Sequence, residues 1–193
     1  MAYDYHIRRV KAVSNGRECI DDKLAEWIGK QYVFFVATAP MARDGHVNCS
    51  PKGGDSFRVL GPMEVAYQDY TGSGAETIAH LRENARIVIM FCAFEGKPQI
   101  LRLHGSARVV TEADPDFTAL SVKFPPALGF RSVIHVHVSR VASSCGFAVP
   151  EMEFRSKRDL LDKWAIAKGE TGLREYRKTK NTSSIDGLPA LSD

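Results

Sequence analysis

The segment from Tyr67 to Phe91, YQDYTGSGAETIAHLRENARIVIMF, constrains the fold more than any other part of the chain. It begins with an extended aromatic stretch, which meets a glycine-rich turn at residues 71–74. Ile78 and Leu81 then follow at helical spacing, and residues 87–91 form an apolar run rich in β-branched side chains. The segment therefore predicts a strand, a glycine turn, a short helix and a buried strand.

A helix that begins in such a turn directs unpaired backbone N–H groups, and the positive end of its dipole, at whatever precedes it. A phosphate group is the natural ligand of that arrangement. The glycines also fit a turn in which they serve backbone geometry only. This stretch alone favours neither interpretation.

The composition is that of a globular protein with a sizeable core, since 44% of the 193 residues are apolar and 25% are charged. The net charge of +3 is too small to indicate a nucleic-acid partner. No stretch reaches the length of a membrane span and the first residues, MAYDYHIRRVK, hold no apolar signal core, so we expect a cytoplasmic protein without a membrane partner. The four widely separated cysteines contain no CxxC pair, which argues against a zinc site or a disulfide framework.

Strand patterns dominate the first 150 residues. Tyr32 to Thr38 (YVFFVAT) is almost wholly apolar and is predicted to be a strand buried on both faces. The turn 43–46 has Asp-Gly at its centre, so residues 47–50 should return antiparallel and end at Pro51 to Gly54. Further extended segments are predicted at 57–60, 63–70, 86–93, 100–110 and 132–142. Six or so antiparallel strands with few helices predict a mainly β fold, a small β-barrel with peripheral helices.

The composition changes near Pro150, which predicts two regions. Residues 1–150 should form the barrel domain, with a surface arm over 3–20 and a first helix capped by Asp21 or Asp22. Residues 151–193 should form a helical extension, with one helix from Ser156 to Lys168 and another from Thr171 to Lys180. Gly169 is expected to separate the two helices.

A second polar segment, VNCSPKG at residues 47–53, ends the predicted hairpin. Asn48, Ser50 and Lys52 offer an amide, a hydroxyl and a flexible cation, which are the groups that a polar ring edge and a phosphate require. A polar strand end with a solvated lysine explains this segment slightly better when it is taken alone. Two such segments in one barrel shift the balance toward a cofactor site.

Several motifs resemble the pyridoxamine 5′-phosphate oxidase-related family of FMN-binding split β-barrels: FFVAT, VNCSPKG, YQDYTGSGAETIAHLRENARI, MFCAFEG and ILRLHGSARV. The sequences SSCGFAVPEMEF and SIDGLP resemble the C-terminal part of one branch of it. The resemblance implies an FMN cofactor and a homodimer with FMN at the subunit interface, and the helical extension would pack on the barrel or on the dimer partner. The predicted cofactor-binding residues are Asn48, Cys49, Ser50, Pro51, Lys52, Gly53, Asp69, Tyr70, Thr71, Gly74, Glu76 and Thr77.

The chain departs from the true oxidases at the start of the central helix. Those enzymes carry Arg-Lys where Glu76 and Thr77 stand here, and a carboxylate beside a phosphate is unfavourable unless it turns away or caps the loop. The phosphate is then held by Lys52, the helix N–H groups and Thr77, or it is displaced toward Arg82 or Arg102. The Arg-x-His pattern that follows the last strand of the true oxidases is also missing, so pyridoxamine phosphate is not the expected substrate.

The resemblance implies an oxidoreductase that acts on a small molecule through hydride transfer at flavin N5. The alternative is a non-catalytic flavin- or haem-type ligand-binding protein, a sensor or store. No residue stands out as an obligatory acid or base. His135 and His137 share a strand face, but no third ligand accompanies them, so no metal site is predicted.

Overall fold

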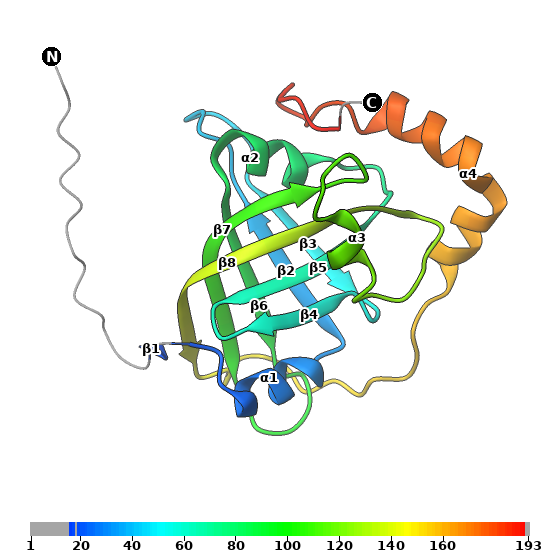
Figure 1. The fold of residues 1–193 in the computed structure, drawn as a ribbon. Coiled ribbons are helices and arrows are strands. Elements are labelled where there is room, and N and C mark those ends of the chain that lie inside the picture. Colours follow the sequence, from blue (N-terminus) through cyan, green and yellow to red (C-terminus); the bar gives the residue numbers. More distant parts are fainter. Residues whose placement is uncertain (1–15, 18, 192–193) are drawn as a thin grey trace, which may run out of the picture.

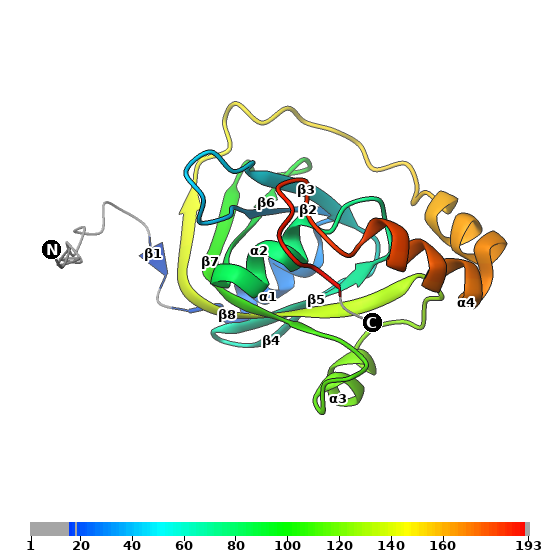
Figure 2. The same ribbon diagram turned by 90° about the horizontal axis from the view of Figure 1, so that it is seen from above.

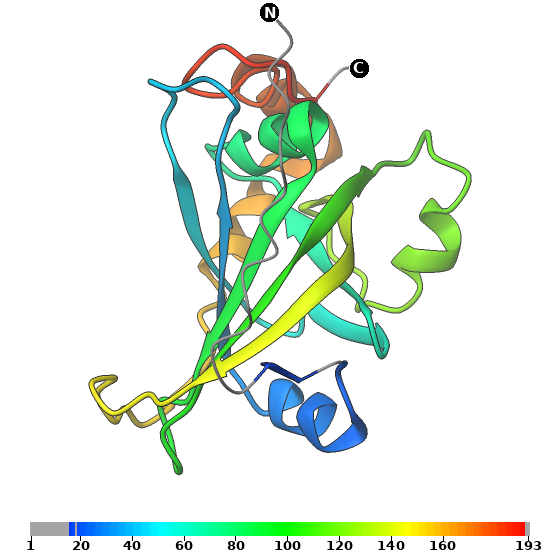
Figure 3. The ribbon, with the colours of Figure 1, turned by 90° about the vertical axis from the view of Figure 1, so that its left-hand side faces the viewer.

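The computed structural model describes residues 16–17 and 19–191. One antiparallel sheet curls into a split barrel, in the strand order β3-β2-β6-β7-β8-β5-β4, with the short β1 paired to β8 (Figures 1 and 3). The strands are β1 (Gly16–Arg17), β2 (Val33–Thr38), β3 (Asn48–Gly53), β4 (Phe57–Gly61), β5 (Glu64–Tyr70), β6 (Arg86–Cys92), β7 (Ile100–Val110) and β8 (Phe130–Ser144). The helices are α1 (Asp22–Gly29), α2 (Glu76–Asn84), α3 (Phe117–Ser121) and α4 (Leu160–Lys180). The predicted mainly β barrel is confirmed.

The β2–β3 hairpin forms as predicted, with Thr38 opposite Asn48 and Phe34 opposite Lys52. Two details differ. Only alternate residues of β2 are buried, because its other face points out of the barrel. In addition, β3 continues through Pro51 to Gly53. A proline is tolerated there because β3 is the last strand of the sheet order and has no further neighbour that needs its N–H.

The two ends of the barrel are closed by helices. Asp21 caps α1, its Oδ1 accepting from the N–H of Leu24 at 2.7 Å, as the sequence predicts. At the opposite end α2 lies within the ring of strands (Figure 2) and buries Ile78, Ala79 and Leu81 in the core. Its C-cap, Ala85, adopts φ 60°, a left-handed conformation. The helix is thus fixed between the turn at residues 71–74 and β6.

After β8 an exposed segment leads to α4, which kinks at Gly169 with φ 62°. Gly169 thus separates two helical runs, as predicted, although the first begins at Leu160 and not at Ser156. Residues 181–191 then return over the end of the barrel that holds α2 (Figures 1 and 2). Nearly all of the predicted N-terminal arm lies outside the described residues. No helix in the described ranges is long and apolar enough to cross a membrane.

Candidate functional site

The two polar segments predicted from the sequence meet beside the start of α2. The amide of Asn48 donates to Thr77 Oγ1 at 2.9 Å and to Thr38 Oγ1 at 3.0 Å. Ser50 Oγ donates to Asn48 Oδ1 at 2.8 Å. Further along β3, Lys52 Nζ lies 3.2 Å from Asp69 Oδ1 on β5. The contact of Asn48 with Thr77 therefore joins β3 to α2, and the contact of Lys52 with Asp69 joins β3 to β5.

Strand geometry divides the predicted β3 residues into two groups. Asn48, Ser50 and Lys52 are half-buried and form the contacts just described, whereas Cys49 and Pro51 are exposed on the other face. Within one chain, Cys49 and Pro51 therefore point away from the residues that Asn48, Ser50 and Lys52 contact.

A buried ion cluster surrounds Asp69, whose side chain is 1% exposed. Arg131 Nε, at the start of β8, lies 2.6 Å from Asp69 Oδ2, and Lys52 pairs with the other oxygen. Burial alone would raise the pKa of Asp69, but the charges of Arg131 and Lys52 outweigh it and lower the pKa. Asp69 is thus an ionised anchor with both oxygens engaged.

The glycine turn is held by three side chains that no sequence pattern predicted for this role: Arg131, Arg177 and Asn181. Arg131 Nη2 donates to Gly74 O at 3.0 Å and its Nη1 donates to Asn181 Oδ1 at 2.9 Å. The amide of the fully buried Asn181 donates to Gly72 O at 2.8 Å. Arg177 Nε donates to Thr71 Oγ1 at 2.8 Å. The C-terminal region therefore holds the turn that precedes α2.

The start of α2 has no side-chain cap, because its N-cap residue is Ala75. The carboxylate of Glu76 folds back over Gly74, where it would collide with any Cβ. Glu76 therefore turns toward the loop, one of the two arrangements that the sequence left open. Thr77 is buried and accepts the hydrogen bond from Asn48.

The two arginines considered as alternative cations for the phosphate, Arg82 and Arg102, do not contact the glycine turn. Arg82 is exposed on α2, and Arg102 donates to Ser144 Oγ at 3.1 Å on the outer face of the sheet. Arg131 and Arg177 are the arginines that contact the turn. Nothing in a single sequence marks them, because they become neighbours of the turn only in the folded chain.

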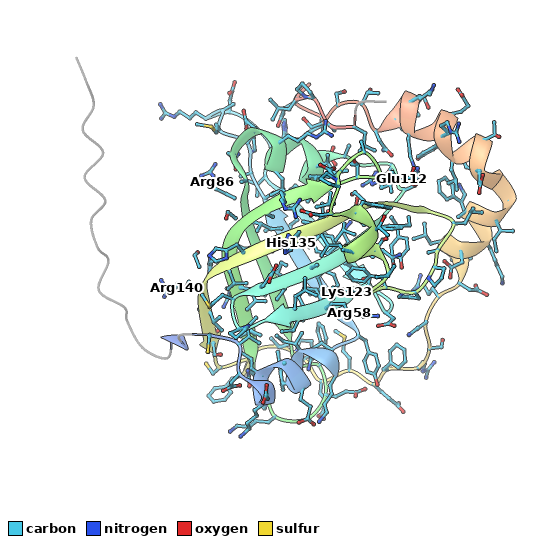
Figure 4. The ribbon with its side chains drawn as sticks, viewed as in Figure 1. Arg58, Arg86, Glu112, Lys123, His135 and Arg140 are labelled. Carbon is cyan, nitrogen blue, oxygen red and sulfur yellow. The ribbon has the colours of Figure 1, made fainter. Side chains whose placement is uncertain are left out.

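The remaining predicted residues have neighbours of their own. Tyr70 donates through its hydroxyl to Gln68 Oε1 at 2.7 Å, and burial raises its pKa. His135 lies on the outer face of β8 and pairs with Glu64 (Figure 4). Among the described residues no group of three or more His, Cys, Asp or Glu could hold a metal ion.

The predicted cofactor residues line none of four cavities formed by the described residues. The largest, about 860 Å³, lies beside α1 and includes Trp27, Tyr32 and Phe154. The polar edge formed by β3 and the turn is therefore an open surface in a single chain. A closed pocket at this edge would need further residues to cover its open side.

Comparison with known proteins gives one family. The pattern that defines the family described as Pyridoxamine 5'-phosphate oxidase matches residues 20–145. The pyridoxamine 5'-phosphate oxidase family protein ustO of Aspergillus flavus is 41% identical over 195 residues, covering 90% of this chain and 76% of its own. Among solved structures, HupZ of Group A Streptococcus matches with a TM-score of 0.50 at 21% identity, over 69% of this chain and 99% of its own. The FAD binding protein of Mycobacterium smegmatis matches with a TM-score of 0.45 at 14% identity, over 66% and 97%.

Proposed function

The chain belongs to the pyridoxamine 5'-phosphate oxidase family, and on that premise we propose that it binds FMN along β3 and the turn before α2. The observation that carries the proposal is the charge around this turn. Lys52, Arg131 and Arg177 supply three cations against the carboxylates of Asp69 and Glu76, an excess of one positive charge. The uncapped start of α2 adds unpaired N–H groups. An anion is the ligand that such a turn favours.

The residues beside the turn fit the rest of the cofactor. Asn48 and Ser50 are half-buried hydrogen-bonding groups on β3, and the side chain of Lys52 is 23% exposed, so its ammonium can reach a phosphate while Asp69 stays paired to Arg131. When bound, FMN supplies a hydride acceptor or donor at N5. This chain's part is to hold and orient the ring. We assign it as an oxidoreductase acting on a small molecule.

FMN should bind the purified protein with a stoichiometry of one per chain and produce the flavin absorbance bands. Titration followed by flavin fluorescence measures the affinity. Riboflavin, which lacks the phosphate, should bind at least tenfold more weakly, because a charge-assisted phosphate contact contributes about 1.5–3 kcal/mol. A protein that binds neither flavin would refute the proposal. Equal affinity for both would refute the phosphate site alone.

Turnover separates the two classes of function. The flavin-loaded protein would be reduced anaerobically by a nicotinamide cofactor and then mixed with a panel of small-molecule acceptors. Reoxidation by one acceptor at a rate above that with buffer supports an oxidoreductase. A flavin that no donor reduces supports the alternative of a sensor or store.

The open polar edge also implies that a second copy of the chain completes the site. The adjacent strands β2 and β6 carry apolar side chains on their outer face, at half-buried positions that face one another in register: Phe35 opposite Met90 and Ala37 opposite Val88. The exposed Cys49 and Pro51 extend the same rows on β3. We propose that a two-fold related copy covers this face, next to the cofactor strand.

Val88→Asp should convert the proposed dimer into a monomer, because the interface would bury an unpaired carboxylate. We expect the dimer dissociation constant, measured by sedimentation equilibrium, to rise roughly a hundredfold or more. Val122→Asp is the matched control, since Val122 is 73% exposed at the end of α3. A wild-type chain that sediments as a monomer with flavin bound would rule out the shared site.

A further inference from the structure

A cavity of about 620 Å³ lies between the second half of α4 and the barrel, and none of the cofactor residues predicted on β3 and the turn lines it. Its charged lining consists of Arg131, Arg174 and Arg177, with Glu112 and Glu170. Glu112 lies on the side of the barrel along which α4 runs (Figure 4). The apolar lining includes Phe130, Leu173 and Leu191. The volume is that of a site for a small organic molecule.

Arg177 is the half-buried arginine of this cavity whose charge no carboxylate pairs with among the described residues. It is half-buried, and its two hydrogen bonds go to neutral acceptors, Thr71 Oγ1 at 2.8 Å and Phe130 O at 2.9 Å. Arg131, in contrast, is neutralised by Asp69. Among the described residues neither Arg177 nor Arg174 forms an ion pair with a carboxylate. An arginine in this position can bind a carboxylate with its remaining N–H groups.

The other lining residues narrow the class of anion. Glu112 and Glu170 are exposed at the rim, so they repel ligands with several negative charges more than a monoanion. The buried Leu173 and the half-buried Phe130 and Leu191 offer a surface for an apolar body. A small aromatic or branched carboxylate matches both features.

We propose that this cavity is a binding site for a small organic monocarboxylate, with its anion on Arg177 and its apolar body against Phe130, Leu173 and Leu191. The cavity is lined by none of the predicted β3 or turn residues, although Arg131 and Arg177, whose charges support the proposed flavin site, also line it. The inference can be tested on the flavin-free protein. It adds a second ligand site, between the C-terminal helix and the barrel.

The test uses 4-fluorobenzoate as the probe, observed by fluorine NMR with the full-length protein. Binding should saturate at one site per chain. Arg177→Gln should weaken it by about tenfold or more, because the charge-assisted contact is lost. Ala127→Phe, which fills the cavity and leaves every arginine in place, should abolish it. Lys180→Gln, which removes an equal charge from an exposed position of α4, should leave the affinity within a factor of two.

Four results would overturn the proposal. One is that 4-fluorobenzoate fails to bind the wild type. Another is that 4-fluorobenzylamine, the cationic analogue, binds as well as the acid. A third is that Arg177→Gln and Ala127→Phe, both folded by circular dichroism, bind as the wild type does. The last is that Lys180→Gln weakens binding as much as Arg177→Gln, since loss of charge alone would then explain the effect.

Discussion

Arg131→Met should lower the free energy of unfolding by about 3–5 kcal/mol, since removing one partner of a buried ion pair leaves the carboxylate of Asp69 with the longer contact to Lys52 alone. Asp69 is 1% exposed and Arg131 is 4% exposed at the side chain, with 2.6 Å between Nε and Oδ2. The substitution also removes the donors to Gly74 O and Asn181. Urea unfolding at pH 7 measures the loss.

The matched control is Arg108→Met, which breaks the exposed pair with Asp116, also at 2.6 Å. Both side chains there are about half exposed (47% and 58%), so the expected loss is about 1 kcal/mol or less. If the two variants lose equal stability, burial is not what gives the Asp69–Arg131 pair its importance.

The pH dependence of Arg131→Met supplies an independent readout. In the wild type the pKa of Asp69 is lowered, so its ionised form stabilises the fold above the unfolded-state pKa of about 3.9, and the contribution is lost as the pH falls below that value. Without Arg131, burial, the largest single influence, is opposed by Lys52 alone, so we expect the folded-state pKa of Asp69 to rise and protonation to favour the folded state. The stability deficit of the variant should therefore shrink as the pH falls from 7 to about 5. A deficit that stays constant over this range would contradict the assignment.

The elements that the sequence predicts well are those determined by neighbouring residues. The predicted β2–β3 pairing forms, although a loop over residues 39–47, with its turn hydrogen bond from Gly45 N–H to Ala42 O, replaces the tight Asp-Gly turn. Gly169, at φ 62°, specifies the kink in α4. The hydrogen bonds that hold the glycine turn are different, since Arg131 and Asn181 are 50 residues apart and Arg177 is 106 residues from Thr71. Helical or strand periodicity carries no information about such pairs.

The error on β2 has a different physical origin. An almost wholly apolar strand was interpreted as buried on both faces within its own chain, but Phe35 and Ala37 are only half-buried on the outer face. A sequence records that a side chain is apolar and does not record which surface covers it. Under the homodimer proposal, a second copy provides the missing cover.

Lys52→Ala should weaken FMN binding by roughly ten- to a hundredfold, because a charged hydrogen bond to the phosphate contributes about 1.5–3 kcal/mol. Stability should change little, since Asp69 keeps its shorter contact with Arg131 when Lys52 is removed. Loss of flavin affinity would then be a property of the site and not of the fold. Fluorescence titration with FMN, and unfolding of the flavin-free protein, measure the two effects separately.

Two controls locate the phosphate. Riboflavin affinity should be nearly the same in Lys52→Ala and in the wild type, because riboflavin offers no phosphate to Lys52. Arg82→Ala should change FMN affinity less than threefold, since Arg82 is exposed on the second turn of α2 and screening by water weakens its field at the helix start. If Arg82→Ala weakened FMN binding more than Lys52→Ala, the phosphate would lie further along α2 and Lys52 would serve only to neutralise Asp69.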